Sequence, residues 1–381
     1  MKKIIAILLT AIMVTSLFSM TAIAAEDAAD SPKDYQDYLW ELTADMSDED
    51  FALYSLRNYK IIQSVEPLLD AASFKTLYKA NVHLKQKAEG SKEEFIEAQN
   101  NIIMYTSMAD GVYFLWDADN IPYDPADAEL TDEELDAAPL DGVGFIPLMV
   151  KYLLDDPSQA KGNIIMLAGG AGNNRSNSGE SYPAAEVFND LGYNCFVLQY
   201  RIAPYTAADR FMDTQRAIRL VKYYAEQEGW GGQDMIAAAG WSAGAMTICG
   251  TINNCYGELT PADVYDPSYV PDEIDAINSD LDVAMPIYGG GIREDCENPH
   301  IPAIYTAVGS EDNVVGVEGE QAMYDLVVSK GIPAQIHIFE GAGHGFGVGQ
   351  EGALKSTDEV KVWPEEADAF MQENLGFNSG K

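Results

Sequence analysis

Short apolar runs alternate with stretches of helical periodicity over the C-terminal part of the chain, from about residue 140 onward. Runs of this length, bounded by polar or glycine-containing segments, are typical of strands that are buried on both faces of a sheet. Strands separated by helices predict an α/β fold with a doubly wound, mostly parallel sheet and helices on both faces. The apolar runs lie at 163–167, 194–198, 235–239, 283–288, 302–308 and 334–339, after a longer apolar segment at 145–154, and helical stretches lie near 182–191 and 208–227.

The N-terminal part of the chain has a different pattern. Between Tyr35 and Met108 apolar residues recur at helical spacing, interrupted only by Pro67, which predicts an N-terminal helical region. The stretch from Asp117 to Pro139 is rich in Asp, Glu, Pro and Ala, as expected for an acidic linker or a loop that wraps its neighbour. The sequence therefore divides into a leader at 1–25, a helical region at 26–116, the acidic stretch at 117–139 and an α/β domain at 140–381.

The leader has the three parts of a secretory signal peptide. Lys2 and Lys3 precede an apolar run from Ile4 to about Met20, and small residues at Ala22 and Ala24 form an A-x-A cleavage pattern. We expect cleavage near residue 25 and export of the remaining chain as a secreted protein. A retained membrane anchor is the alternative, because the apolar run is near the lower length of a spanning helix. No later apolar run is long enough to span a bilayer, so no stable membrane insertion is expected after cleavage.

The segment Gly240-Trp241-Ser242-Ala243-Gly244 follows the apolar run 235–239 and precedes a run of small residues that are compatible with a helix. A serine at a sharp turn between a strand and a helix, with glycine two positions before and after it, is typical of a nucleophile elbow. The glycines allow the backbone to bend tightly, and the serine hydroxyl then projects from the edge of the sheet. Ser242 is therefore the predicted nucleophile.

A serine hydroxyl is a weak nucleophile at neutral pH, so it needs a histidine base that a carboxylate holds in place. His344 lies in a glycine-rich loop directly after the apolar run 334–339, and Asp312 follows the run 302–308. Ser242, Asp312 and His344 then occur in the chain order serine, acid, histidine, each just past a predicted strand. Glu311 is the rival acid, since it is adjacent to Asp312 and is also ionised at neutral pH.

The other three histidines have simple structural explanations. His83 lies in a polar helical stretch, His300 follows a proline, and His337 alternates with isoleucines in a predicted strand.

Acyl transfer also needs backbone N–H donors that face the developing oxyanion. One is expected from Ala243, which directly follows the nucleophile. The second is expected in the glycine-rich turn after the run 163–167, from Gly170 or Ala171. This turn matches neither G-x-G-x-x-G nor G-x-x-x-x-G-K-[ST], so no nucleotide cofactor is predicted.

Together these motifs resemble the α/β-hydrolase esterases, a group that includes acetyl esterases and acetylxylan-esterase-like enzymes. The resemblance covers roughly residues 140 to 376, and it implies an α/β-hydrolase fold and a carboxylic ester hydrolase with no cofactor. It further implies short acyl esters, of the acetyl type, on carbohydrate or small-molecule alcohols as substrates. The residues that carry it are the turn at 169–172, Tyr200 to Pro204, Asp213, Arg216, Gly240 to Gly244, Asp312 and His344.

One position departs from the family pattern. The family often places His or Pro before three glycines, whereas Ala168 precedes the glycines here, and this leaves the second oxyanion donor open. Arg201, in the Tyr200 to Pro204 segment, is predicted to brace the fold through its hydrogen-bonding fork. A serine peptidase of related fold and a non-catalytic binding protein derived from a hydrolase remain alternatives.

The segment from Asn253 to Leu281 is rich in Tyr, Pro and Asp and follows the predicted helix after Ser242. It is suited either to a substrate-pocket wall or to a surface excursion whose tyrosines pack inward. Tyr256, Tyr265 and Tyr269 are the candidate stacking surfaces for a sugar or an aromatic ester. Trp241 is a further pocket candidate beside the nucleophile, although we expect it to pack against the sheet.

The chain is strongly acidic, with 61 Asp and Glu against 23 Lys and Arg and a formal net charge of −38. Such a surface repels nucleic acids and anionic membranes, and it is compatible with neutral glycans or small esters. The four cysteines have no scaffold or metal spacing, and we expect mostly buried free thiols, with a Cys255–Cys296 bridge as the alternative.

The acidic stretch contains closely spaced oxygen ligands that could suggest calcium. The sixth position of an EF-hand loop must be glycine, but Pro122 occupies it here, so a solvated loop is preferred and no metal is predicted. The acids and the amide considered are Asp117, Asp119, Asn120, Asp124 and Asp127.

Overall fold

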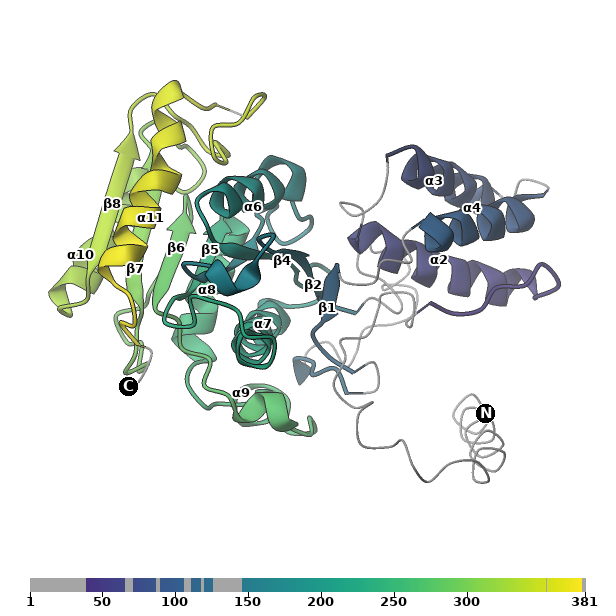
Figure 1. Cartoon of the computed structure of the whole chain (residues 1–381), viewed down its shortest axis with the longest axis horizontal. Helices are drawn as coiled ribbons and strands as arrows, with labels where there is room; N and C mark the ends of the chain where they lie inside the picture. The colour runs from purple at the N-terminus through teal and green to yellow at the C-terminus, as the bar shows by residue number, and fades with distance from the viewer. Residues whose placement is uncertain are drawn as a thin grey trace. The chain divides into compact units, whose positions relative to one another are not determined.

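A computed structural model describes residues 39–65, 71–86, 90–105, 111–117, 120–125, 146–353 and 355–378. Its centre is an eight-stranded sheet with the order β1-β2-β4-β3-β5-β6-β7-β8 (Figure 1). The strands from β4 to β8 pair in parallel, whereas β1 with β2 and β2 with β4 pair antiparallel. The strands are β1 Val112–Phe114, β2 Leu148–Tyr152, β3 Asn163–Leu167, β4 Asn194–Gln199, β5 Ile236–Trp241, β6 Val283–Ile287, β7 Ala303–Gly309 and β8 Ala334–Phe339.

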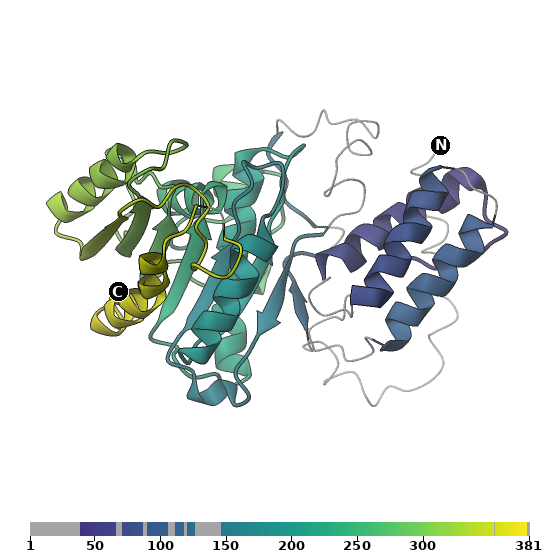
Figure 2. The same ribbon diagram turned by 90° about the horizontal axis from the view of Figure 1, so that it is seen from above.

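Helices cover both sides of the sheet (Figure 2). Alternate residues of β3 belong to two different apolar clusters, with Ile164 and Met166 on one side and Ile165 and Leu167 on the other. The first cluster includes buried residues of α6 and α11, and the second includes residues of α7, α8 and α10. These helices are α6 Ser181–Asp190, α7 Ala207–Gln227, α8 Ala243–Asn254, α10 Val317–Ser329 and α11 Trp363–Glu373.

The predicted doubly wound, mostly parallel sheet is therefore confirmed. Both faces of β3 and β5 are buried, which explains why their sequences read as continuous apolar runs rather than as alternating ones. The antiparallel edge formed by β1 and β2 is an addition to this picture. The strand β1 has only three residues, which is too short to give a recognisable pattern.

Three helices precede the sheet along the chain, as the spacing of apolar residues predicts: α2 Asp48–Ser64, α3 Ala71–Lys85 and α4 Ser91–Tyr105. Ser47 caps α2, because its hydroxyl accepts a hydrogen bond from the N–H of Asp50. The buried Asn58 of α2 donates to Gln99 of α4, and the rings of Phe51 and Phe95 meet edge to face. Among the described residues, no helix combines the length and the apolarity that crossing a membrane requires.

The segment boundaries proposed from the sequence stay a prediction. The leader at 1–25 and most of the acidic stretch at 117–139 lie outside the described residues.

Candidate active site

Ser242 lies at the turn between β5 and α8 with φ 50° and ψ −115°, a conformation that L-residues rarely adopt. Its N–H donates to the carbonyl oxygen of Ile287 on β6, which fixes the turn to the sheet. The flanking glycines are needed for close packing, since a Cβ on Gly244 would lie 2.0 Å from the Leu167 carbonyl oxygen. A Cβ on Gly240 would lie 2.7 Å from the backbone of Gly244. The strained turn is thus held from both sides, as a preorganised nucleophile requires.

The structure brings the three predicted triad residues together. His344 Nε2 lies 2.9 Å from Ser242 Oγ, and His344 Nδ1 lies 2.8 Å from Asp312 Oδ2. An ionised carboxylate can only accept, so Nδ1 carries the proton and Nε2 is left to accept from the serine hydroxyl. Asp312 follows β7 and His344 follows β8, and both lie at the carboxyl edge of the parallel strands with Ser242. The rival acid Glu311 is exposed, and the contact with His344 Nδ1 is made by Asp312 instead.

The environment of Asp312 keeps its carboxylate ionised. Its side chain is fully buried, and burial alone would raise its pKa. Hydrogen bonds from His344 and from the N–H groups of Val314 and Val315 outweigh burial, and the pKa is lowered below its ordinary value. The His344 side chain is 18% exposed, so a substrate can reach the base.

The glycine-rich turn predicted to hold the oxyanion lies directly against the nucleophile. A Cβ on Gly169 would lie 2.9 Å from Ser242 Cβ, so only glycine allows this approach. Gly170 and Ala171 both have positive φ, at 128° and 54°, and the Gly169 N–H is already used in a hydrogen bond to a carboxylate. Ala243 is the first residue of α8, where backbone N–H groups have no acceptor within the helix. The donor roles of Ala243, Gly170 and Ala171 stay predictions.

Two of the four pocket candidates are buried and are not available to a substrate. Trp241 is 0% exposed and packs edge to face against Trp363. The expectation that Trp241 packs within the fold is therefore confirmed. Tyr269 is 6% exposed and its hydroxyl donates to Asp275. The ring of Trp241 packs in one apolar cluster of the sheet, and the ring of Tyr269 packs in the other.

The segment from Asn253 to Leu281 connects α8 to β6 and carries three of the four pocket candidates. The 12 residues of α8 carry the chain about 18 Å away from Ser242, and the segment then returns to the start of β6. It includes α9 Pro261–Val264 and is fixed to α7, because Arg219 donates to the carbonyl oxygens of Leu259 and Ile277 (Figure 1). Tyr269 of this segment packs inward, whereas Tyr256 and Tyr265 are partly exposed and their part in a substrate pocket stays a prediction.

Arg201 braces the fold, as predicted. Its guanidinium is 1% exposed and donates to Asp213, Asp209 and the carbonyl oxygen of Pro122. Burial lowers the pKa of this guanidinium, but the two carboxylates outweigh burial and raise it overall. Arg201 thus joins the segment after β4 to the first turns of α7.

Replacing Arg201 by methionine would leave Asp209 and Asp213 buried without their cation. Breaking a buried ion pair from one side costs about 3 to 5 kcal/mol, because the remaining charge is uncompensated. We expect a loss of this size in the free energy of unfolding, measured by urea denaturation of the variant and the wild type. Arg293→Met is the matched control, since its exposed pair with Asp295 contributes at most about 1 kcal/mol. Equal losses in the two variants would contradict the bracing role.

The remaining histidines and the cysteines have no place in the triad. Among the described ion pairs, His83, His300 and His337 contact Glu94, Asp280 and Glu366 in that order. All four cysteines are free thiols, with Cys195, Cys249 and Cys255 buried and Cys296 partly buried, and Cys255 forms no bridge to Cys296. The part of the chain that the structure describes holds no cluster of three or more metal-ligating side chains, while Asp119 and Asp127 lie outside it.

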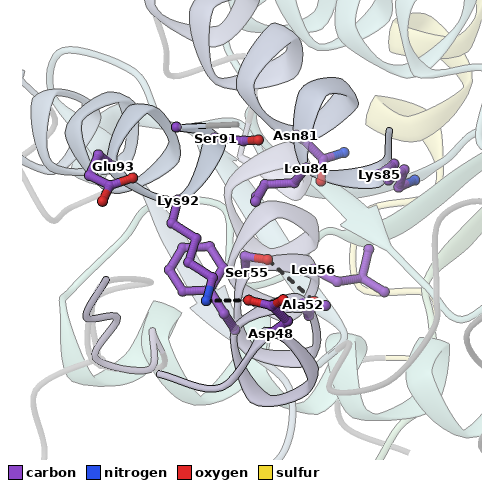
Figure 3. Close-up of a pocket in the computed structure, with 12 residues that line it drawn as sticks. Asp48, Ala52, Ser55, Leu56, Asn81, Leu84, Lys85, Ser91, Lys92 and Glu93 are labelled. Atoms are coloured by element: carbon purple, nitrogen blue, oxygen red, sulfur yellow. Dashed lines mark hydrogen bonds and ion pairs between the residues drawn. The ribbon is translucent and has the colours of Figure 1, made fainter. Parts of the chain in front are cut away.

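A pocket of about 450 Å³ lies among α2, α3 and α4 (Figure 3). Phe51 forms part of its apolar lining, and Lys92 forms an ion pair with Asp48 across it at 2.6 Å. The Ser55 hydroxyl in this pocket donates to the carbonyl oxygen of Ala52 rather than to a base. The pocket contains no triad residue and no pair of nucleophile and base, so it is separate from the site described above.

Sequence reasoning missed two buried residues beside the triad, Glu180 and Tyr288. Glu180 accepts a 2.6 Å hydrogen bond from the N–H of Gly169 and a 2.9 Å hydrogen bond from the Tyr288 hydroxyl. The ring of Tyr288 contacts the ring of His344 with centroids 4.9 Å apart. No motif marks Glu180 in a chain with 61 acids, and only its contact with a residue 108 positions away singles it out.

The fold and the geometry of the site define an α/β-hydrolase. Residues 274–374 match the dienelactone hydrolase family, and this segment runs from just before β6 to α11 and contains Asp312 and His344. This part of the chain is similar to dienelactone hydrolases, and the match agrees with the class of carboxylic ester hydrolases.

A solved structure with a TM-score above 0.5 shares the fold. An acetyl ester-xyloside bifunctional hydrolase from Caldicellulosiruptor lactoaceticus is 23% identical with a TM-score of 0.54, over 69% of this chain and 95% of that one. An esterase from Thermogutta terrifontis is 24% identical with a TM-score of 0.49, over 63% of this chain and 93% of that one. No curated relative matches the chain in sequence.

Proposed function

We propose that this protein is a serine esterase that cleaves short acyl esters, of the acetyl type, on carbohydrate or small-molecule alcohols. The observation that carries the proposal is the hydrogen-bonded chain from Ser242 Oγ through His344 to the buried Asp312. Nucleophile, base and orienting acid stand at the carboxyl edge of the sheet, where α/β enzymes assemble their sites.

In the first step Ser242 Oγ bonds to the ester carbonyl carbon while His344 Nε2 takes the hydroxyl proton. The carbonyl electron pair moves onto its oxygen, which the N–H of Ala243 and one N–H of the Gly170–Ala171 turn stabilise. When this pair returns, the bond to the alcohol oxygen breaks and His344 gives its proton to the leaving alcohol. A water molecule then repeats the sequence on the acyl-enzyme, which releases the carboxylic acid and restores Ser242.

The acyl and alcohol classes are inferred from two similarities and from the charge of the chain. The resemblance carried by the sequence motifs is to acetyl esterases, and the C. lactoaceticus protein that shares the fold is named as an acetyl ester hydrolase. The formal net charge of −38 favours neutral substrates over anionic polymers.

The decisive experiment offers the purified protein an aryl acetate, acetylated xylan, a feruloyl ester and a dipeptide amide. We expect turnover of the acetyl esters and little of the dipeptide, together with a fluorophosphonate adduct that mass spectrometry maps to Ser242. Faster cleavage of the dipeptide would replace the esterase proposal by a peptidase. Absence of both turnover and adduct would support a binding protein.

We also propose that the chain is exported and cleaved near residue 25, on the strength of its charged, apolar and small-residue segments. Expression of the full-length gene product in a bacterial host tests this, by fractionation and N-terminal sequencing. A mature protein that starts near Ala25 outside the cytoplasm is the expected result, and an uncleaved chain in the membrane fraction would favour the anchor.

A further inference from the structure

We propose that Glu180 is a positioning residue for the proposed ester hydrolysis, one that must be ionised to hold the oxyanion turn and the histidine loop in their active arrangement. The proposal rests on the proposed function, because it concerns the same site. Its basis is a continuous set of hydrogen bonds that links three segments which are distant in sequence.

The two oxygens of Glu180 bind two different parts of the site. Oε2 accepts from the N–H of Gly169, at the start of the oxyanion turn. Oε1 accepts from the Tyr288 hydroxyl, and that hydroxyl in turn accepts from the N–H of Gly347 in the histidine loop at 3.2 Å. Gln350 in the same loop donates to the carbonyl oxygen of Gly179, beside Glu180. The carboxylate therefore connects the turn beside Ser242 to the loop that carries His344.

The direction of these bonds requires the ionised form of Glu180. Burial and the Glu180 carboxylate raise the pKa of Tyr288 well above its ordinary value, so the phenol keeps its single proton and donates it to Glu180. A proton on Oε1 would point at this same hydroxyl, which already accepts from Gly347. One of the two protons would then have no acceptor, which is costly in a buried site.

The electrostatic surroundings place this ionisation near neutral pH. Burial raises the pKa of Glu180 to about 7, although the bonds from Gly169 and Tyr288 favour the charged form. Within the described part of the chain, Glu180 has no ion-pair partner, and Tyr288 faces it from the end of β6. The ring of Tyr288 contacts His344 and is close to Asp312, and the two acids within α6, Glu186 and Asp190, are exposed. The ionised fraction of Glu180 thus rises with pH through this range.

Glutamine at position 180 tests the inference, because it keeps the shape but offers only one acceptor. We expect Glu180→Gln to lower kcat for an aryl acetate about 10- to 100-fold with KM nearly unchanged, as misplacement of catalytic groups does. At acidic pH, log kcat/KM should depend less steeply on pH in the variant than in the wild type, because glutamine at this position does not titrate.

Controls separate this inference from a folding defect and from the proposed function itself. Glu186→Gln, on the same helix, should behave like the wild type, and Tyr288→Phe should lower kcat without adding fully to the effect of Glu180→Gln. Near-UV circular dichroism reports folding, and if Glu180→Gln fails to fold, Tyr288→Phe carries the test. A wild-type pH slope and kcat in the folded variants would overturn the inference, while a wild type with no esterase activity would overturn the proposed function instead.

Discussion

Replacement of Ser242 by alanine is expected to lower kcat for an aryl acetate by about 10⁵-fold or more, because no other group can form the acyl-enzyme. His344 and Asp312 act on the hydroxyl proton of Ser242, so they contribute little once that hydroxyl is gone. Steady-state kinetics with high enzyme concentrations, together with loss of the fluorophosphonate adduct, measure this effect.

The same substitution should leave the fold intact. Alanine lacks only the Oγ atom, which is hydrogen-bonded to His344, and the turn is held by the backbone hydrogen bond to Ile287. We expect Tm within a few degrees of the wild type. Turnover near the wild-type rate in a folded Ser242→Ala protein would show that the nucleophile lies elsewhere.

The sequence predicts those parts of the site that depend on local pattern. β3 and β8 occupy the predicted residues, although β3 is buried on both faces and β8 is a partly exposed edge strand. Ser242, Asp312 and His344 each follow a strand, so the parallel direction of β5, β7 and β8 alone brings them to one edge. The choice of Asp312 over Glu311 is decided by burial and by bonds to Val314 and Val315, which the sequence does not reveal.

Features that depend on distant contacts could not be predicted in this way. The burial of Tyr269 and its hydrogen bond to Asp275 depend on the tertiary packing of the segment after α8, which its place behind the nucleophile in the sequence does not reveal. The Glu180–Tyr288 contact depends on where α6 begins and where β6 ends, and neither position carries a motif. Hydrophobic pattern therefore locates the elements, whereas the tertiary arrangement decides which polar side chains meet between them.

Asp312→Asn is expected to lower kcat by about 10⁴-fold, because it stabilises the tautomer of His344 that cannot accept the serine proton. The Oδ1 atom accepts from Val314 and Val315, so the amide oxygen of asparagine takes that position and the NH₂ group faces His344 Nδ1. Nδ1 must then accept, which moves the histidine proton to Nε2 and leaves no base for Ser242. Steady-state kinetics at saturating substrate measure the loss.

The lowered pKa of Asp312 and the variant Glu311→Gln distinguish the role of Asp312 from that of other acids. The lowered pKa of Asp312 keeps it ionised across the working range, so its contribution to stability is lost only as the pH falls through that lowered value. A loss of wild-type activity near neutral pH would therefore not be a titration of Asp312. Glu311→Gln removes an exposed charge next to Asp312 in the sequence. We expect this variant to retain wild-type kcat within about 2-fold, because exposed charges interact weakly with their neighbours. If Glu311→Gln lost activity and Asp312→Asn kept it, the acid of the triad would be Glu311.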